Sequence, residues 1–165
     1  MTRPPFDAPS DDDIAEVSRQ LGRPARGVIG IAARCVCGKP VVVATSPRLP
    51  DGTPFPTLYY LTHPAATASI STLEATGVMA ELQTELADEE LAAAYRQAHD
   101  SYLADRESID VVPEIAGFSA GGMPNRVKCL HALAGHALAA GPGVNPIGDR
   151  ALAAARWSIT RCECV

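Results

Sequence analysis

The stretch of residues 121–136 constrains this chain most, because it joins a Gly-Gly turn to a segment that carries thiol and imidazole side chains. The spacing of apolar residues predicts a helix over residues 125–140, which ends at a Gly-Pro-Gly sequence. On a regular helix Cys129 and His136 share a face, whereas His131 lies roughly 200° around the axis from Cys129. Cys129 and His131 can therefore reach one ion only if Cys129 lies in an irregular first turn.

Three short apolar segments precede this region and predict strands at residues 27–34, 40–45 and 57–62. Turn-forming proline, aspartate and glycine residues lie between them, which favours antiparallel pairing. Further along the chain, the apolar residues recur at helical spacing. We therefore expect an α+β fold in which a small N-terminal antiparallel sheet packs against about five or six helices.

Length and composition indicate a single folded unit. The chain has 165 residues, of which 47% are hydrophobic and 20% are charged, as is typical of globular domains. We expect a disordered, proline-rich lead-in over residues 1–9, one globular metal-binding domain over residues 10–158 and a tail over residues 159–165.

Charge and hydropathy limit the partners and the location of the protein. The net charge is −5, whereas a nucleic-acid-binding surface needs a basic patch, so we expect no nucleic-acid partner. No apolar run approaches the roughly 20 residues that span a bilayer. The N-terminal sequence also lacks the apolar stretch of a signal peptide. We therefore expect a cytoplasmic protein without a membrane span, whose thiols stay reduced.

The cysteines indicate a metal site. Cys35 and Cys37 form a Cys-x-Cys pair followed by glycine, and in a reducing compartment this pattern is typical of metal binding rather than of disulfides. Thiolates and imidazoles suit zinc, and four of them around one ion close a structural site. His63, at the end of the third predicted strand, and Cys129 are further candidate ligands.

A second Cys-x-Cys pair, Cys162 and Cys164, lies near the end of the sequence. Three interpretations are open for it: ligands of the same ion, a redox pair, or a frayed terminus without a role.

Several motifs resemble, in the same order, those of a known family. They are Cys35–Gly38, Leu49–Thr57, Tyr60–Pro64, Val127–His131, His136 and Asn145–Pro146. The chain is similar in these motifs to an uncharacterised bacterial family, domain of unknown function 501, from about Leu21 to Gly148. That family has no established activity to transfer. Its members usually carry cysteine where this chain has His63, and an exchange between these residues keeps a zinc ligand. The resemblance therefore favours a Cys3His zinc site, with the ligands Cys35, Cys37, His63 and Cys129.

Three functions follow from such a site. The first is a structural role for zinc, with the surrounding surface binding an unknown protein partner. The second is a metal-dependent hydrolase acting on a phosphate-containing or other small substrate, in which His131 or His136 is the general acid or base and Arg126 and Lys128 receive a small anionic ligand. The third is an iron–sulfur protein. A nucleophilic Cys129 at the start of the helix is a further alternative.

Overall fold

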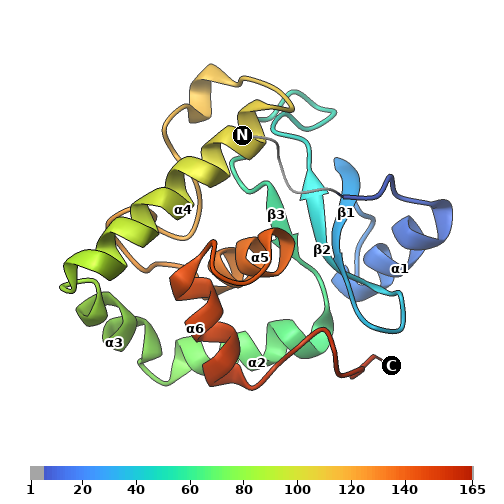
Figure 1. Ribbon diagram of the computed structural model, residues 1–165. Coiled ribbons are helices and arrows are strands. Elements are labelled where there is room, and N and C mark those ends of the chain that lie inside the picture. Colours follow the sequence, from blue (N-terminus) through green and yellow to red (C-terminus); the bar gives the residue numbers. More distant parts are fainter. Residues whose placement is uncertain (1–5, 165) are drawn as a thin grey trace.

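The computed structural model describes residues 6–164 and has the α+β fold that the sequence predicts (Figure 1). Within these residues, three antiparallel strands form one sheet in the order β1-β2-β3, and six α-helices accompany it. The strands are β1 (Val28–Arg34), β2 (Pro40–Thr45) and β3 (Tyr59–Leu61). The helices are α1 (Asp11–Leu21), α2 (Pro64–Ala75), α3 (Val78–Glu85), α4 (Glu89–Glu107), α5 (Leu130–Ala140) and α6 (Pro146–Ala155), with a short 3-10 helix, η1 (Pro113–Ile115), after α4. No helix in this part of the chain has both the length and the apolar character that crossing a membrane requires.

Helix α1 covers one face of the sheet. A capping box fixes its start, because Ser10 and Asp13 each accept the other's backbone N–H with their side chains. Its buried residue Val17 packs against Ile31 of β1 and Val43 of β2. Strand β2 lies at the centre of the sheet and is buried along its whole length.

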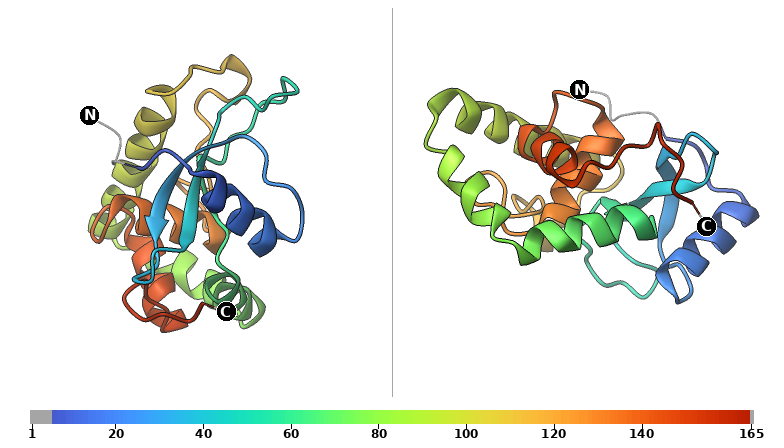
Figure 2. Two further views of the ribbon diagram at one scale, coloured as in Figure 1. Left: turned by 90° about the vertical axis from the view of Figure 1, so that its right-hand side faces the viewer. Right: turned by 90° about the horizontal axis from the view of Figure 1, so that it is seen from below.

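Helix α5 covers the opposite face, and α2, α4 and α6 pack around it (Figure 2). Val42 and Ala44 of β2 belong to the larger core on this side. Tyr102 of α4 fixes the start of β3, because its buried hydroxyl accepts the N–H groups of Leu58 at 2.6 Å and Tyr59 at 3.3 Å. Helix α5 therefore packs between the sheet and the helices on this side of it.

The predicted helix over residues 125–140 is wrong at its start, because α5 begins only after Cys129. The residues before it form turns held by backbone hydrogen bonds that a helix does not use. The N–H of Lys128 donates to the carbonyl of Gly121 at 2.7 Å, and the side-chain amide of Gln83 bonds to two backbone groups of this loop, at 2.8 and 3.1 Å. Cys129 is consequently the N-cap of α5.

The two ends of the described chain both lie against the sheet. The expected disordered lead-in falls outside the described residues as far as residue 5, whereas Phe6 packs against the core and the backbone of Asp7 exchanges two hydrogen bonds with Ile31. The tail leaves α6 and runs toward the turn between β1 and β2 (Figure 1). There the carbonyl of Ile159 accepts the N–H of Val36 at 2.9 Å, so the tail is attached to this turn as far as it is described, to residue 164.

Candidate metal centre

The two Cys-x-Cys pairs meet where the tail reaches the β1–β2 turn. The Sγ atoms of Cys35, Cys37, Cys162 and Cys164 lie within 4.8 Å of one another, and those of Cys37 and Cys164 are 3.4 Å apart. Cys35 is buried, Cys164 is half-buried, and the other two are exposed. We call these four residues the four-cysteine cluster.

A tight turn presents the first pair of cysteines. Gly38 has φ 95°, a conformation that favours glycine, and its N–H donates to the carbonyl of Cys35 at 2.8 Å. The N–H of Cys35 donates to the carbonyl of Lys39 at 2.9 Å and closes the hairpin. The tail is then positioned by the hydrogen bond from Val36 to Ile159, independently of any sulfur.

The thiols of the cluster differ in their acidity. Burial raises the pKa of Cys35 and that of Cys164, whereas the backbone N–H of Lys39 lowers the pKa of Cys37 to about 7. Four thiols at this spacing do not ionise together on their own, because neighbouring thiolates repel one another. A cation removes that repulsion, and the donor set fits a thiophilic metal ion.

His63 lies beside the cluster. It is the N-cap of α2, where its Nδ1 accepts the N–H of Ala66 at 3.4 Å, and its Nε2 lies 3.1 Å from the Sγ of Cys164. Burial lowers the pKa of His63, so the ring is neutral near neutral pH. Because Nδ1 accepts, the single ring proton lies on Nε2 and faces Cys164. In this tautomer His63 offers the sulfur a hydrogen bond and offers a metal ion no lone pair.

Cys129 lies in a different group, with Glu74 of α2 and His131 of α5, whose ligand atoms are within 4.8 Å of one another. The Oε1 atom of Glu74 is 3.1 Å from the Nδ1 of His131 and also accepts the N–H of Leu130 at 2.8 Å. The irregular position of Cys129 before the helix allows it to approach His131. Of the predicted ligands, the structure thus brings two together with the tail cysteines, places His63 beside them and puts Cys129 elsewhere.

From the sequence alone the role of the tail pair stays open, and nothing in it points to Glu74. The tail had a signal, since Cys162 and Cys164 repeat the Cys-x-Cys pattern of the turn. Glu74 had none, because it is one of 19 acidic residues and its pairing with His131 depends on how α2 packs against α5.

His136, a candidate acid or base, is fully buried in the core. Its ring stacks on Tyr59 and meets Tyr102 edge-on, with ring centroids 5.7 and 5.0 Å away. Its Nδ1 accepts from the side-chain amide of Asn145 at 3.1 Å, and its Nε2 has no hydrogen-bond partner among residues 6–164. Burial lowers the pKa of His136 to about 4, so the ring is neutral near neutral pH. A ring in this position meets neither solvent nor the thiols.

The candidate anion-binding residues, Arg126 and Lys128, are exposed on the loop before α5. Neither side chain makes an ion pair within the described part of the chain. Since α5 begins at Leu130, neither residue lies in its first turn.

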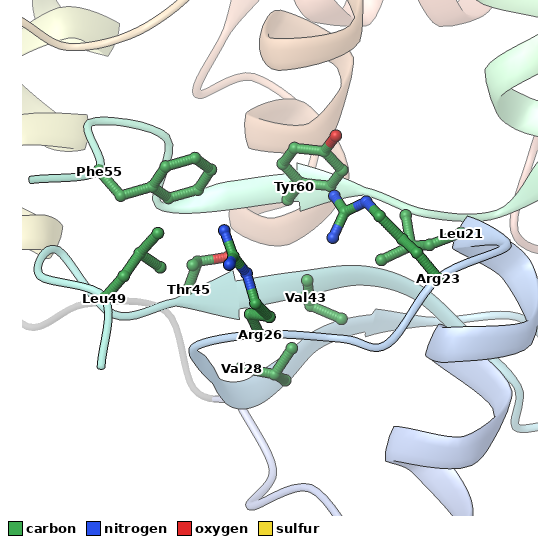
Figure 3. Close-up of a pocket in the computed structure, with 9 residues that line it drawn as sticks. All are labelled: Leu21, Arg23, Arg26, Val28, Val43, Thr45, Leu49, Phe55 and Tyr60. Atoms are coloured by element: carbon green, nitrogen blue, oxygen red, sulfur yellow. The ribbon is translucent and has the colours of Figure 1, made fainter. Parts of the chain in front are cut away.

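A small hollow lies on the α1 side of the sheet, away from the cysteines (Figure 3). Its lining comes from the end of α1, the following connection, the three strands and the β2–β3 loop: Leu21, Arg23, Arg26, Val28, Val43, Thr45, Leu49, Phe55 and Tyr60. Arg23 and Arg26 both extend over the strands toward it (Figure 3). Its volume is about 70 Å³, far below the roughly 300 Å³ at which small-molecule sites begin. The hollow does not form a ligand site of ordinary size.

Fold and cluster together define the class of this molecule: a small α+β protein with four cysteines that could hold a metal ion. The chain belongs to the family described as Protein of unknown function (DUF501), whose model matches residues 31–153. This match confirms the resemblance seen in the motifs. No curated protein and no solved structure matches the chain. The matched region includes Cys35, Cys37 and Cys129 but ends before Cys162 and Cys164, so half of the four-cysteine cluster lies outside the family model.

Proposed function

We propose that this chain is a metal-binding protein whose four-cysteine cluster holds one zinc ion and thereby fastens the tail to the β1–β2 turn. One observation carries the proposal: four thiols from two distant segments lie within 4.8 Å of one another. Sulfur atoms bonded at about 2.3 Å to one tetrahedral ion lie about 3.8 Å apart. A spacing within 4.8 Å, with 3.4 Å between Cys37 and Cys164, is close enough for all four sulfur atoms to reach a single ion, which supports the proposal.

The same spacing favours zinc over the alternative of an iron–sulfur centre. An iron–sulfur cluster places its own iron and sulfide atoms between the cysteines, and so separates the cysteine sulfur atoms more widely than one ion does. Thiolate ligands suit zinc well. The Nε2–H of His63, 3.1 Å from the Sγ of Cys164, supports the bound state further, because it can donate to a thiolate sulfur.

Four thiolates fill the coordination of zinc, which supports a structural role rather than a metal-dependent hydrolase that needs an open position for water. The ion would hold the tail at the β1–β2 turn, where the backbone hydrogen bond between Val36 and Ile159 also attaches it. Val36, between the two cysteines of the turn, is 67% exposed, and we propose that the surface around the ion serves a protein partner. The free thiols suit a reducing compartment, and we propose the cytoplasm as the location.

The decisive measurement is metal content by plasma mass spectrometry on untagged protein purified anaerobically, with an absorption spectrum of the same sample. We expect about one zinc per chain and no visible absorption. Cys162→Ala should lose the metal, whereas the matched control Cys129→Ala should keep it. A chelator should lower the melting temperature of the wild-type protein and leave that of Cys162→Ala unchanged.

Three results would overturn this proposal. Iron together with visible absorption would show that the cysteines hold an iron–sulfur cluster rather than zinc. If Cys129→Ala loses the metal and Cys162→Ala keeps it, Cys129 is a metal ligand, as the sequence indicated, and the tail is not part of the site. If the protein contains no metal after anaerobic purification and addition of zinc, the four cysteines do not form a metal site, and the structural role of zinc is refuted.

A further inference from the structure

Three oxygen atoms on one face of α2 hold the ring of His131. Its Nδ1 lies 3.1 Å from the Oε1 of Glu74, and its Nε2 lies 3.1 Å from the Oγ of Ser71 and 3.3 Å from the backbone carbonyl of Thr67. The three residues recur at helical spacing and so line one stripe of α2. Carboxylate and carbonyl oxygens only accept, so the contacts with Glu74 and Thr67 favour a ring that donates from both nitrogens, as an imidazolium does, and the hydroxyl of Ser71 can accept from the same Nε2.

Cys129 supplies the negative partner of this cation. Its Sγ is within 4.8 Å of the ligand atoms of Glu74 and His131, and its position as the N-cap of α5 puts it at the positive end of the helix dipole. The hydrogen bond with His131 lowers the pKa of Cys129, and the same contact raises the pKa of His131 to about 9. The contact therefore favours the thiolate–imidazolium form of the pair.

The pair opens onto a pocket of about 390 Å³, within the size range of small-molecule sites. Tyr59, Tyr60 and Leu61 of β3 form one wall, and Cys129 and His131 belong to the other. The side chain of His131 is 28% exposed, so a small molecule in the pocket can reach the pair. The thiol thus lies beside a pocket whose exposed lining is largely apolar.

The contacts favour a nucleophile over a second metal site. A metal ligand must offer a lone pair, but both ring nitrogens of His131 face acceptors. The Oε1 of Glu74 already accepts from Leu130 and from His131. A metal ion would have to displace these contacts, whereas a nucleophile, a proton carrier and an orienting carboxylate use them as they stand.

We propose that Cys129 is the nucleophile of an acyl-transfer site in this pocket, with His131 as its proton carrier and Glu74 as the residue that holds the ring. The substrate class that fits is a small ester or thioester with an apolar acyl group, since the exposed lining of the pocket is largely apolar. This site is independent of the four-cysteine cluster.

The chemistry balances without a further reactant except water. The thiolate attacks the carbonyl carbon, a C–S bond forms, and the electron pair of the C=O bond moves to the oxygen. The C=O bond then re-forms, the bond to the leaving group breaks, and that group takes a proton from His131. Water adds to the resulting thioester and returns a proton to His131. The carboxylic acid leaves and the thiolate is restored.

The test uses the full-length wild-type protein and p-nitrophenyl acetate as the probe. We expect a burst of about one nitrophenolate per chain, followed by slower turnover. Mass spectrometry of the trapped protein should find one acetyl group, on Cys129. Cys129→Ala should abolish the burst, and the matched control Cys162→Ala should retain it, which separates this site from the four-cysteine cluster.

The roles of the other two residues need separate readouts. His131→Gln should slow acylation by about 100-fold or more, because the hydrogen bond that lowers the pKa of Cys129 and favours its thiolate is lost. Glu74→Gln should lower the midpoint of the His131 titration, followed by NMR, because the carboxylate that raises the pKa of this ring is removed, while the circular dichroism spectrum stays that of the wild type. A structural role of Glu74 alone would not move this midpoint.

Two results would overturn the proposal. One is acetylation distributed over the cysteines, with a burst that survives in Cys129→Ala. The other is a second metal ion in the wild-type protein that Cys129→Ala loses and Cys162→Ala keeps, which would make Glu74, Cys129 and His131 metal ligands instead.

Discussion

Burial of the neutral His136 ring should make the protein unstable in acid, and replacing the ring should remove part of that instability. The ring is fully buried, and burial lowers its pKa to about 4, against 6.5 in an exposed histidine. Above pH 6.5 the ring is neutral in the folded and the unfolded chain, so it adds no pH dependence. Between pH 6.5 and 4 the unfolded chain binds the proton and the folded protein does not. The free energy of unfolding must therefore fall as the pH falls through this window.

The size of the effect follows from the two pKa values. Each unit of pH in the window changes the free energy by about 1.4 kcal/mol, so His136 removes about 2 kcal/mol by pH 5 and about 3 kcal/mol by pH 4. Small domains are stable by about 5 to 15 kcal/mol, so this loss is a large part of the total. For a chain of this size it corresponds to a melting temperature lower by roughly 4 to 8 °C at pH 5.

The assay is urea unfolding of the wild type and of His136→Gln at pH 7, 6 and 5. Glutamine keeps an acceptor for Asn145 but does not titrate, so the variant should lose about 2 kcal/mol less than the wild type between pH 7 and pH 5. The variant should be less stable at pH 7, because the stacking on Tyr59 is lost. The difference in slope is the readout, since the pKa of His63 is also lowered and the cysteines would release a metal in acid in both proteins. Equal losses in the two proteins would refute a neutral, buried His136.

Two substitutions test the packing that positions α5. Tyr102→Phe removes the acceptor of the backbone N–H groups of Leu58 and Tyr59, and should lower the free energy of unfolding by about 1 to 3 kcal/mol in urea unfolding without changing the metal content. Gly148→Ala would place a Cβ 2.2 Å from the backbone carbonyl of Leu133, so α5 and α6 must separate; we expect a loss of about 1 to 3 kcal/mol or more by thermal unfolding, and an unchanged melting temperature would contradict the close approach.

The sheet could be predicted because its signals are local. The structure has strands at Val28–Arg34, Pro40–Thr45 and Tyr59–Leu61, within two residues of the predicted ends. Short β-branched and aromatic segments between turn-forming residues define them. The start of α1 is likewise determined within four residues, by the box of Ser10 and Asp13.

The start of α5 could not be predicted, because its determinant is distant in the sequence. The spacing of residues 125–140 is compatible with a helix throughout, but the side-chain amide of Gln83, in α3, binds the backbone of the preceding loop. Tertiary contact therefore overrides a periodic pattern here. The displaced boundary brings Cys129 to the N-cap, the arrangement under which the sequence allowed it to meet His131.

Which residues form the four-cysteine cluster could not be predicted from the sequence, for a similar reason. The sequence offered more soft ligands than one ion needs, and the choice among them depends on where the tail lies. The bond between Val36 and Ile159 brings Cys162 and Cys164 to the turn, across more than 120 residues of chain. No local pattern records that contact, whereas the Cys-x-Cys spacing shows which residues are able to share an ion.

The two thiol sites differ in what balances the negative charge of a thiolate, and this difference explains why they should have different chemistry. In the four-cysteine cluster the sulfur atoms face one another, so several thiolates can coexist only around a cation from outside. Beside Cys129 the chain supplies its own cation, the His131 ring, whose pKa is raised to about 9 and whose two nitrogens face Glu74 and Thr67. To bind a metal ion there, the His131 ring must first lose a proton that it retains well above neutral pH. A thiolate that is balanced within the chain remains available to an electrophile, whereas thiolates that share a metal do not.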